Sequence, residues 1–269
     1  MAYELEEYFC IFIDILGYTK RMENSAKKNE LENELKDYID NVVDEIEYLN
    51  ELSSIIPFQI NIFTDNILIT LPAKKETINN FHLVLRFIID YQTTLILRNY
   101  FIRGGITKGK MFVNKDKDTI WGPALIEAVQ IEKSTKYPFI GISDKILKLF
   151  RINDLLSDTN DLLNIPFIEI EGRNVLDYLG HRIIFKNNDT IPQYSDFLDF
   201  HKKIVDCSLK KYKNDENILN KYLSLAKYHN EFCNLHKDKL PPIQDLLINY
   251  YPNTDVSYKR KYLRMKLDN

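Results

Sequence analysis

The chain has 269 residues, a formal net charge of −3 and 45% hydrophobic residues. This length allows one large or two small domains with a sizeable core, and the slight acidity argues against a nucleic-acid partner. Three widely spaced cysteines form neither a disulfide framework nor a zinc-binding spacing. No apolar run approaches the roughly 20 residues of a membrane span, and the N-terminus is acidic, unlike a signal peptide. We therefore expect a soluble cytoplasmic protein with no membrane partner.

The first predicted element is a buried strand over residues 8–14, which ends at a carboxylate. The apolar run 8–13 is too short for a membrane span and has the length of a core strand. Asp14 ends it, and Gly17 then opens a polar stretch that is typical of a helix start. Because free backbone N–H groups at such junctions attract anions, we expect a ligand site here. Asp14 could hold a hard cation at this point, or simply cap the helix that follows.

The second predicted feature is a hairpin of strands 57–63 and 66–72, with Asp65 in its turn. Apolar and β-branched residues flank the turn, as is typical of paired strands. Asp is also an ordinary turn residue, so Asp65 alone indicates no site. If the hairpin lies beside the first strand, Asp14 and Asp65 converge. Two such carboxylates suit one or two divalent ions and a nucleoside triphosphate.

Further helices and strands follow up to about residue 186. Apolar residues at helical spacing predict a long helical region over about 19–53 and a helix, capped by Thr77, that ends near residue 97. The other elements predicted in this region are strands 100–107 and 109–114 with a turn at Lys108–Gly109, a helix over 123–135 begun by Pro123, strand 138–142, a helix over 143–151 capped by Ser143, and strands 165–171 and 177–185.

After Pro192 the pattern changes to helices alone, over 193–213, 215–236 and 241–249. We therefore expect two units, a first domain over residues 1–186 and a helical C-terminal extension over 187–269. The basic tail from Lys259 is expected to be a solvated terminus.

Five ordered segments resemble the class III nucleotide cyclases. The first two are F-I-D-I-L-G-Y-T over 12–19 and F-T-D over 63–65. The others are I-R-G-G-I-T-K-G over 102–109, I-W-G-P-A-L-I-E-A-V-Q-I-E over 120–132 and Y-P-F-I-G-I-S over 137–143. Each segment alone is a weak signal, whereas their order within residues 8–185 is specific. The R-G-G-I form and the G-P-A-L variant are most similar to the Pycsar pyrimidine cyclases of bacterial antiphage defence.

The resemblance implies an α+β fold, with a class III nucleotide cyclase (ferredoxin-like) sheet and flanking helices. It also implies a two-metal site shared between the subunits of a head-to-tail homodimer. Asp14 and Asp65 would hold two divalent ions, Mn²⁺ or Mg²⁺, one of them also bound by the backbone carbonyl of Ile15. The phosphates would be bound by Gly17, Tyr18, Thr19 and Arg103.

Two helix positions depart from the family pattern. Ile126 stands in place of an Asn that contacts the ribose, and Gln130 in place of an Arg that stabilises the transition state. Loss of such a stabiliser commonly costs several kcal/mol. Gln130 could still donate a hydrogen bond, and the missing contacts could come from Glu127, Lys108 or Arg173. Alternatively, the protein is a slow or inactive cyclase.

The two positions that resemble the base readers of the family carry neither purine signature. Asn61 replaces the Lys of adenylate cyclases or the Glu of guanylate cyclases, and Thr119 replaces the Asp of adenylate cyclases. A short amide can match the pairing edge of uracil or of cytosine. We expect UTP, favoured over CTP, to be cyclised to a second messenger that acts on a separate effector. An adenylate or guanylate cyclase, or a catalytically silent nucleotide-binding regulatory module, stays open as an alternative.

Overall fold

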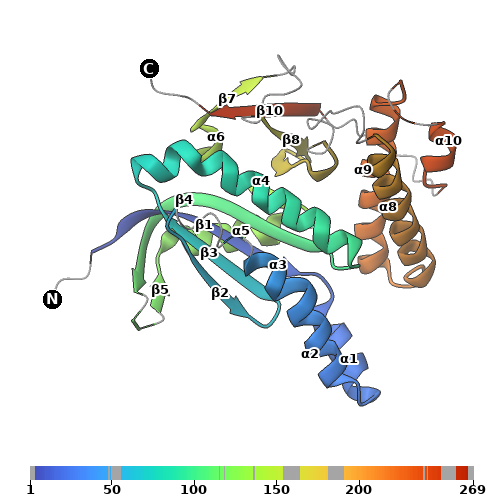
Figure 1. The fold of residues 1–269 in the computed structure, drawn as a ribbon, viewed down its shortest axis with the longest axis horizontal. Coiled ribbons are helices and arrows are strands. Elements are labelled where there is room, and N and C mark those ends of the chain that lie inside the picture. The colour runs from blue at the N-terminus through green and yellow to red at the C-terminus, as the bar shows by residue number, and fades with distance from the viewer. Residues whose placement is uncertain are drawn as a thin grey trace.

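A computed structural model describes residues 4–47, 49, 56–114, 116–117, 119–135, 137–153, 164–180, 191–238, 240, 242–249 and 259–265. These residues form a mixed sheet with helices packed against it (Figure 1), which confirms the predicted α+β class. The strands are β1 (Glu6–Ile15), β2 (Gln59–Phe63), β3 (Asn66–Pro72), β4 (Ile102–Asn114), β5 (Thr119–Trp121), β6 (Ile140–Ile142), β7 (Phe150–Asn153), β8 (Asn164–Ile170), β9 (Arg173–Leu176) and β10 (Lys259–Met265). The helices are α1 (Tyr18–Lys27), α2 (Leu31–Tyr38), the π-helix η1 (Ile39–Val43), α3 (Asp44–Glu47), α4 (Lys75–Leu97), α5 (Pro123–Ser134), α6 (Asp144–Leu147), α8 (Ile191–Lys211), α9 (Glu216–Leu235) and α10 (Ile243–Leu246).

Strand β1 is a central strand of the sheet, whose order is β2-β3-β1-β4-β6-β9-β8-β10-β7 with β5 on β4. Its neighbours β3 and β4 both run antiparallel to it. Alternate side chains of β1 are fully buried in the main core, where Phe9 stacks on Phe81 of α4 with ring centroids 3.8 Å apart. Because β1 is held on both edges and on this face, the position of Asp14 near its end is fixed.

Helix α5 lies on the opposite face of β1 and β4, and a glycine permits this close packing. A Cβ atom at Gly105 would lie 2.1 Å from the carbonyl oxygen of Ala128, so any side chain there would push the helix away. Ala124 and Ala128 of α5 are buried against Cys10 and Met111 of the sheet. This contact sets the orientation of α5 and turns Glu132, one further turn along, toward the sheet.

Strand β4 differs from the prediction of two strands with a turn at Lys108–Gly109. Both residues belong to one continuous strand, in register with Phe9 and Tyr8 of β1. The long partner strand extends the ladder through a dipeptide that, on local sequence alone, favours a turn. The predicted turn is therefore wrong.

The helical region predicted over 19–53 is confirmed in its described part, where it is divided into α1, α2, η1 and α3. Asn29, with a left-handed φ of 59°, reverses the chain between α1 and α2. Arg21 of α1 then forms ion pairs with Glu34 and Asp37 of α2. Residues 48 and 50–53 of this prediction lie outside the described residues.

Two predicted helix caps have different outcomes. The Ser143 hydroxyl accepts a hydrogen bond from the backbone N–H of Ile146 at 3.4 Å, which confirms the cap of α6. Thr77 is buried inside α4, whose N-cap residue is Lys74, so that cap is wrong. Local sequence marks a helix start less well where tertiary burial decides which residue begins the helix.

Two strand and helix boundaries near the end of the first region also differ. Residues 150–153 form β7, so the helix predicted over 143–151 is shorter than expected. The strand predicted over 177–185 lies earlier, at Arg173–Leu176, and residues 178–180 are helical. Residues 181–185 lie outside the described part of the chain, as does the proposed domain boundary at residue 186.

The C-terminal region contains the predicted helices, with α8 and α9 packed side by side at one end of the sheet (Figure 1). Lys259–Met265, expected to be a solvated terminus, instead forms β10 between β8 and β7. Its backbone satisfies the hydrogen-bonding edges of two strands that lie far away in the sequence. Among the described helices, none has the length and apolar character needed to cross a membrane.

Candidate active site

Asp14 and Asp65 come together at the end of β1. Asp14 is in register with Asn66 of β3, and the backbone N–H of Ile15 donates to the carbonyl oxygen of Asp65 at 2.9 Å. Burial is the main cause that raises the pKa of Asp14, and the nearby Asp65 carboxylate raises it further. The convergence predicted from the two strands is therefore present.

Arg103 occupies the other side of Asp14, on the neighbouring strand β4. Its Nε donates to Oδ2 of Asp14 at 2.9 Å and also forms an ion pair with Glu132 of α5. The Glu132 side chain is only 3% exposed, and burial raises its pKa while Arg103 opposes that rise. The guanidinium is thus held between two carboxylates, one from the sheet and one from the helix.

The turn after β1 presents backbone groups close to these carboxylates. Gly17 has a left-handed φ of 76° and precedes the first residue of α1, which has neither a side-chain cap nor an acidic residue in its first turn. Tyr18 is half-buried against the ring of Tyr38, and Thr19 is exposed. A left-handed residue followed by free N–H groups is an arrangement that accepts anions.

Asn61 lies on β2, on the same sheet face as Asp14 by register through Leu68 and Phe12. Its amide oxygen is shielded from solvent and accepts no hydrogen bond from the described residues. A shielded acceptor without a donor costs about 1–3 kcal/mol. A bound ligand that donated to this oxygen would remove that cost, so Asn61 remains a candidate contact.

Asp14 and Asp65 are the carboxylates that could hold a divalent ion at this site. Within the described residues, no group of three or more His, Cys, Asp and Glu side chains could hold a metal ion. Oδ1 of Asp65 already accepts from Thr64 and Asn66 at 2.8 and 3.1 Å. Mg²⁺ is commonly bound by one or two carboxylates together with substrate phosphates and water. Asp14 and Asp65 therefore suit a metal ion that is also bound by the triphosphate of a substrate. They supply too few ligands to hold such an ion by themselves.

Three predicted site residues are not brought to Asp14 within one chain. Thr119 is aligned with Asn114, at the end of β4 opposite to Arg103, about 36 Å away along an extended strand. Gln130 is exposed on α5, two residues from the inward-facing Glu132, and so projects from another face of the helix. Glu127 forms an ion pair with Lys145 at 2.5 Å. These residues could meet Asp14 only in another copy of the chain.

Two residues near the site were missed by the sequence reasoning. Glu132 is the last residue of a quoted motif, but no role was assigned to it. Lys221 of α9 lies close enough to Asp14, Arg103 and Glu132 to interact with their charges. Its helix carried no sequence signal beyond apolar periodicity, which predicts packing alone.

Comparisons with known proteins find only remote similarity to solved structures of nucleotide cyclases. No protein-family model matches the sequence, and no curated protein matches it. The monomeric guanylyl cyclase domain of a RhoGC fusion protein from the fungus Blastocladiella emersonii is 13% identical with a TM-score of 0.44, over 65% of this chain and 96% of that one. An adenylate/guanylate cyclase/hydrolase from Silicibacter pomeroyi is 18% identical with a TM-score of 0.41, over 64% and 95%. A class III adenylyl cyclase-like ATP-binding protein from Pseudomonas aeruginosa is 12% identical with a TM-score of 0.41, over 68% and 41%. At TM-scores this low the likenesses carry no argument about activity, which has to be inferred from the chain's own residues.

Proposed function

We propose that the chain is a nucleotide cyclase that converts UTP, and less readily CTP, to the 3′,5′-cyclic monophosphate and pyrophosphate. The observation that carries this proposal is the meeting of Asp14 and Asp65 at one strand end, beside Arg103 and the Gly17 turn. Paired carboxylates, a guanidinium and free N–H groups are the set of groups that phosphoryl transfer requires. The proposal includes the metals, Mn²⁺ or Mg²⁺, and a cytoplasmic location.

In the proposed reaction the ribose 3′-oxygen forms a bond to the α-phosphorus, and the bond from that phosphorus to the bridging oxygen breaks. Pyrophosphate leaves with the bonding electron pair, and the hydroxyl proton passes to water. Divalent ions held by Asp14 and Asp65 would lower the pKa of the 3′-hydroxyl. Arg103 would hold a phosphate oxygen, and the backbone from Gly17 to Thr19 would orient the phosphate chain.

The proposal requires two copies of the chain in a head-to-tail dimer. Thr119, Gln130 and Glu127 do not reach Asp14 of their own chain, so a partner has to supply them. Exposed apolar side chains suit such a contact: Phe63 is 57% exposed, Trp121 63% and Ile126 62%.

Sedimentation should therefore show a dimer of the 31.9 kDa chain at micromolar concentration. Asp14→Asn and Gln130→Glu chains, each inactive alone, should recover about a quarter of wild-type activity when mixed, since half of the dimers would be mixed with one intact site each. An active monomer, or no recovery in a confirmed mixed dimer, would contradict the shared site.

Asn61 is proposed to read the base. Uracil presents O4 and N3–H on its pairing edge, and a single amide can match both. Cytosine presents N4–H₂ and N3, which the same amide matches only when it is turned over. The preference for UTP over CTP then depends on which way the Asn61 amide is held, and the preference over ATP and GTP on the absence of a purine-reading side chain.

Asn61→Ala should therefore reduce the ratio of UTP to CTP turnover by about tenfold, the equivalent of one hydrogen bond. Gln59→Ala is the matched control, because Gln59 lies on the same face of β2 and its amide oxygen also has no partner among the described residues. The measurement is turnover of all four nucleoside triphosphates by the wild type and both variants. An unchanged ratio in Asn61→Ala would remove Asn61 as the reader, and a wild type that prefers ATP or GTP would show a purine cyclase.

A silent nucleotide-binding module is the second candidate, favoured by one observation. Arg103 is already paired with both Asp14 and Glu132, so it has to exchange a partner before it can bind phosphate. Binding of UTP without formation of any cyclic product would support this candidate. The role of the product as a second messenger in antiphage defence, acting on a separate effector, rests on the resemblance of the R-G-G-I and G-P-A-L segments.

A further inference from the structure

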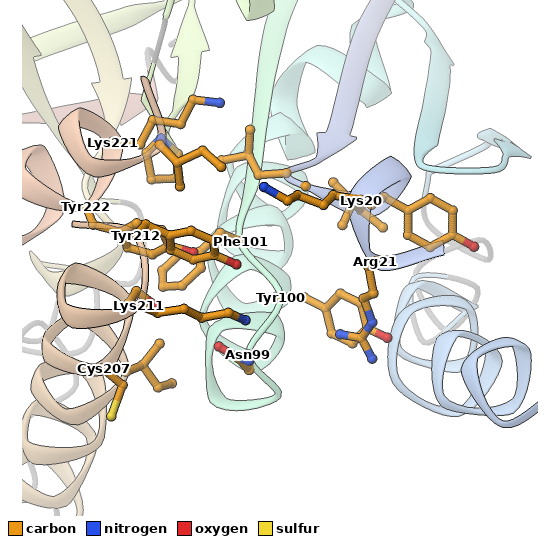
Figure 2. A pocket seen from close by; sticks show the side chains of 18 of the residues that line it. Lys20, Arg21, Asn99, Tyr100, Phe101, Cys207, Lys211, Tyr212, Lys221 and Tyr222 are labelled. Carbon is orange, nitrogen blue, oxygen red and sulfur yellow. The ribbon is translucent and has the colours of Figure 1, made fainter. Parts of the chain in front are cut away.

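A large cavity lies past the end of β1, between the helix pair α1–α2 and the C-terminal helices α8–α9. Its volume is about 750 Å³, within the usual size range of small-molecule sites. Figure 2 shows Lys20 from α1 and Lys211 from α8 on opposite walls, with Lys221 of α9 on the same side as Lys211. The cavity begins at the turn of Ile15 to Tyr18 and so adjoins the candidate active site.

Each wall of this cavity is held in place by contacts among its own side chains. On the α1 side, the Arg21 guanidinium lies 4.3 Å above the ring of Tyr100, whose hydroxyl donates to Asp37 at 2.6 Å. On the α9 side, Tyr212 and Tyr222 are stacked with ring centroids 5.7 Å apart. The two walls are also linked to each other, because Lys20 of α1 lies 3.9 Å from the carboxylate of Asp215, the N-cap residue of α9. These contacts within the chain make the cavity preformed.

The charge of the cavity is strongly unbalanced. Its basic lining residues are Lys20, Arg21, Lys28, Lys203, Lys211 and Lys221, and its acidic lining residues are Glu30 and Glu34.

Four of the basic residues have a carboxylate partner. Arg21 pairs with Glu34, Lys203 with Asp199, Lys28 with Glu30 at 4.0 Å, and Lys20 with Asp215 at 3.9 Å. Lys211 and Lys221 form no ion pair with any described carboxylate. Lys211 is exposed, with its ammonium group 5.0 Å from the centroid of the Tyr212 ring, whereas Lys221 is half-buried. Since no carboxylate in the described part of the chain holds either ammonium group in a close pair, both are available to a bound anion.

We propose that this cavity binds a condensed phosphate, with Lys211 and Lys221 as its charged contacts from the C-terminal helices. A condensed phosphate carries several negative charges along a short chain, so one ligand can span cations on facing walls. Ammonium groups bind phosphate oxygens as point charges and need no fixed bidentate geometry. A monovalent carboxylate would balance only one of the two lysines.

The position of the cavity indicates where such a ligand comes from, and this step rests on the proposed function. The cyclisation releases pyrophosphate at the Gly17 turn, where the cavity begins. Lys221 is half-buried and interacts with the charges of Asp14, Arg103 and Glu132. It would then supply, from α9 of the same chain, a positive charge that Gln130 does not.

Two of the residues that the sequence offered in place of the missing family contacts already have other partners. Lys108 pairs with Glu7, and Glu127 pairs with Lys145.

The test is calorimetric titration of the full chain with tripolyphosphate in the presence of EDTA, which removes any metal-mediated binding. We expect the wild type to bind, and Lys211→Gln and Lys221→Gln each to weaken binding about tenfold. Lys210→Gln is the matched control, because Lys210 is exposed on α8 beside Lys211 and does not line the cavity. Equal binding by all three variants, or no binding by the folded wild type at millimolar ligand, would overturn the proposal.

Two further measurements distinguish this proposal from the proposed reaction. Asp14→Asn should still bind tripolyphosphate even though it cannot cyclise UTP, and loss of binding in this variant would show that the phosphate sits on the carboxylate site instead. If pyrophosphate displaces tripolyphosphate and a UTP analogue with an α,β-methylene bridge does not, the ligand is the pyrophosphate leaving group. If the UTP analogue displaces it, the ligand is the triphosphate of the substrate. If neither displaces it, the proposed origin of the ligand in the cyclisation reaction is wrong.

Discussion

Asp14→Asn and Asp65→Asn are each expected to reduce cyclisation of UTP by at least about a hundredfold. The amide keeps the size of the carboxylate but removes the charge that would hold a divalent ion. Asp65 lies in a hairpin turn and Asp14 at a strand end, and neither contributes to the hydrophobic core. Both variants should therefore stay folded while they lose activity.

The comparison needs a control and a measurement of folding. Asp116→Asn removes a carboxylate from an exposed loop beyond β4 and should leave activity unchanged. Thermal unfolding of all three variants checks that the loss is catalytic. If either Asp14→Asn or Asp65→Asn retains wild-type turnover at ordinary metal concentration, the two carboxylates do not form the metal site.

Arg103→Met is expected to destabilise the fold by about 3 kcal/mol, the low end of the cost of breaking a buried ion pair by removing one partner. The low end is appropriate because Arg103 is 25% exposed, whereas its partner Glu132 is almost fully buried. The methionine fills the space of the aliphatic stem, so the loss is mainly the charge. Without the guanidinium, the carboxylates of Glu132 and Asp14 lose the cation that pairs with both of them.

The pH dependence of this variant gives a sharper test. In the wild type burial already raises the pKa of Glu132, and Arg103 opposes that rise, so in Arg103→Met the pKa is raised further. A carboxyl whose pKa is higher in the folded than in the unfolded state gives stability that is present at low pH and is lost as pH rises. The deficit of Arg103→Met should therefore be small below the ordinary Glu pKa of 4.5 and grow above it.

Glu132→Gln in the Arg103→Met background should restore about half or more of the lost stability at neutral pH, because it removes the buried charge that the first change leaves unpaired. Urea unfolding of the wild type, both single variants and the double variant at two pH values measures the coupling. A deficit that is equal at both pH values, or that Glu132→Gln increases, would show that Arg103 stabilises the fold by packing alone.

The parts of the fold that local sequence predicted are those that short segments decide by themselves. The β2–β3 hairpin, the helix begun by Pro123 and the cap at Ser143 each follow from a few adjacent residues. By contrast, β10 forms between β8 and β7. Lys108–Gly109 continues strand β4 because it pairs with β1, which lies far away in the sequence. Pairing between strands far apart in sequence decides these elements, and no local pattern records it.

The candidate site divides in the same way. The placement of Asp14, Asp65 and Arg103 followed from an ordered set of motifs on adjacent strands. Glu132 needed the packing of α5 on Gly105, and Lys221 needed the docking of α9 beside α1. Both are set by tertiary contacts, so sequence spacing could not have placed either beside Asp14.

The most direct measurement is identification of the product when the purified wild-type chain is incubated with each of the four nucleoside triphosphates and Mn²⁺. Mass spectrometry detects the nucleotide product, and phosphorus NMR detects pyrophosphate released in equal amount. The account predicts 3′,5′-cyclic UMP as the main product, less cyclic CMP, and neither from Asp14→Asn. Absence of a cyclic nucleotide from all four substrates, with a folded dimer and bound metal, would contradict it.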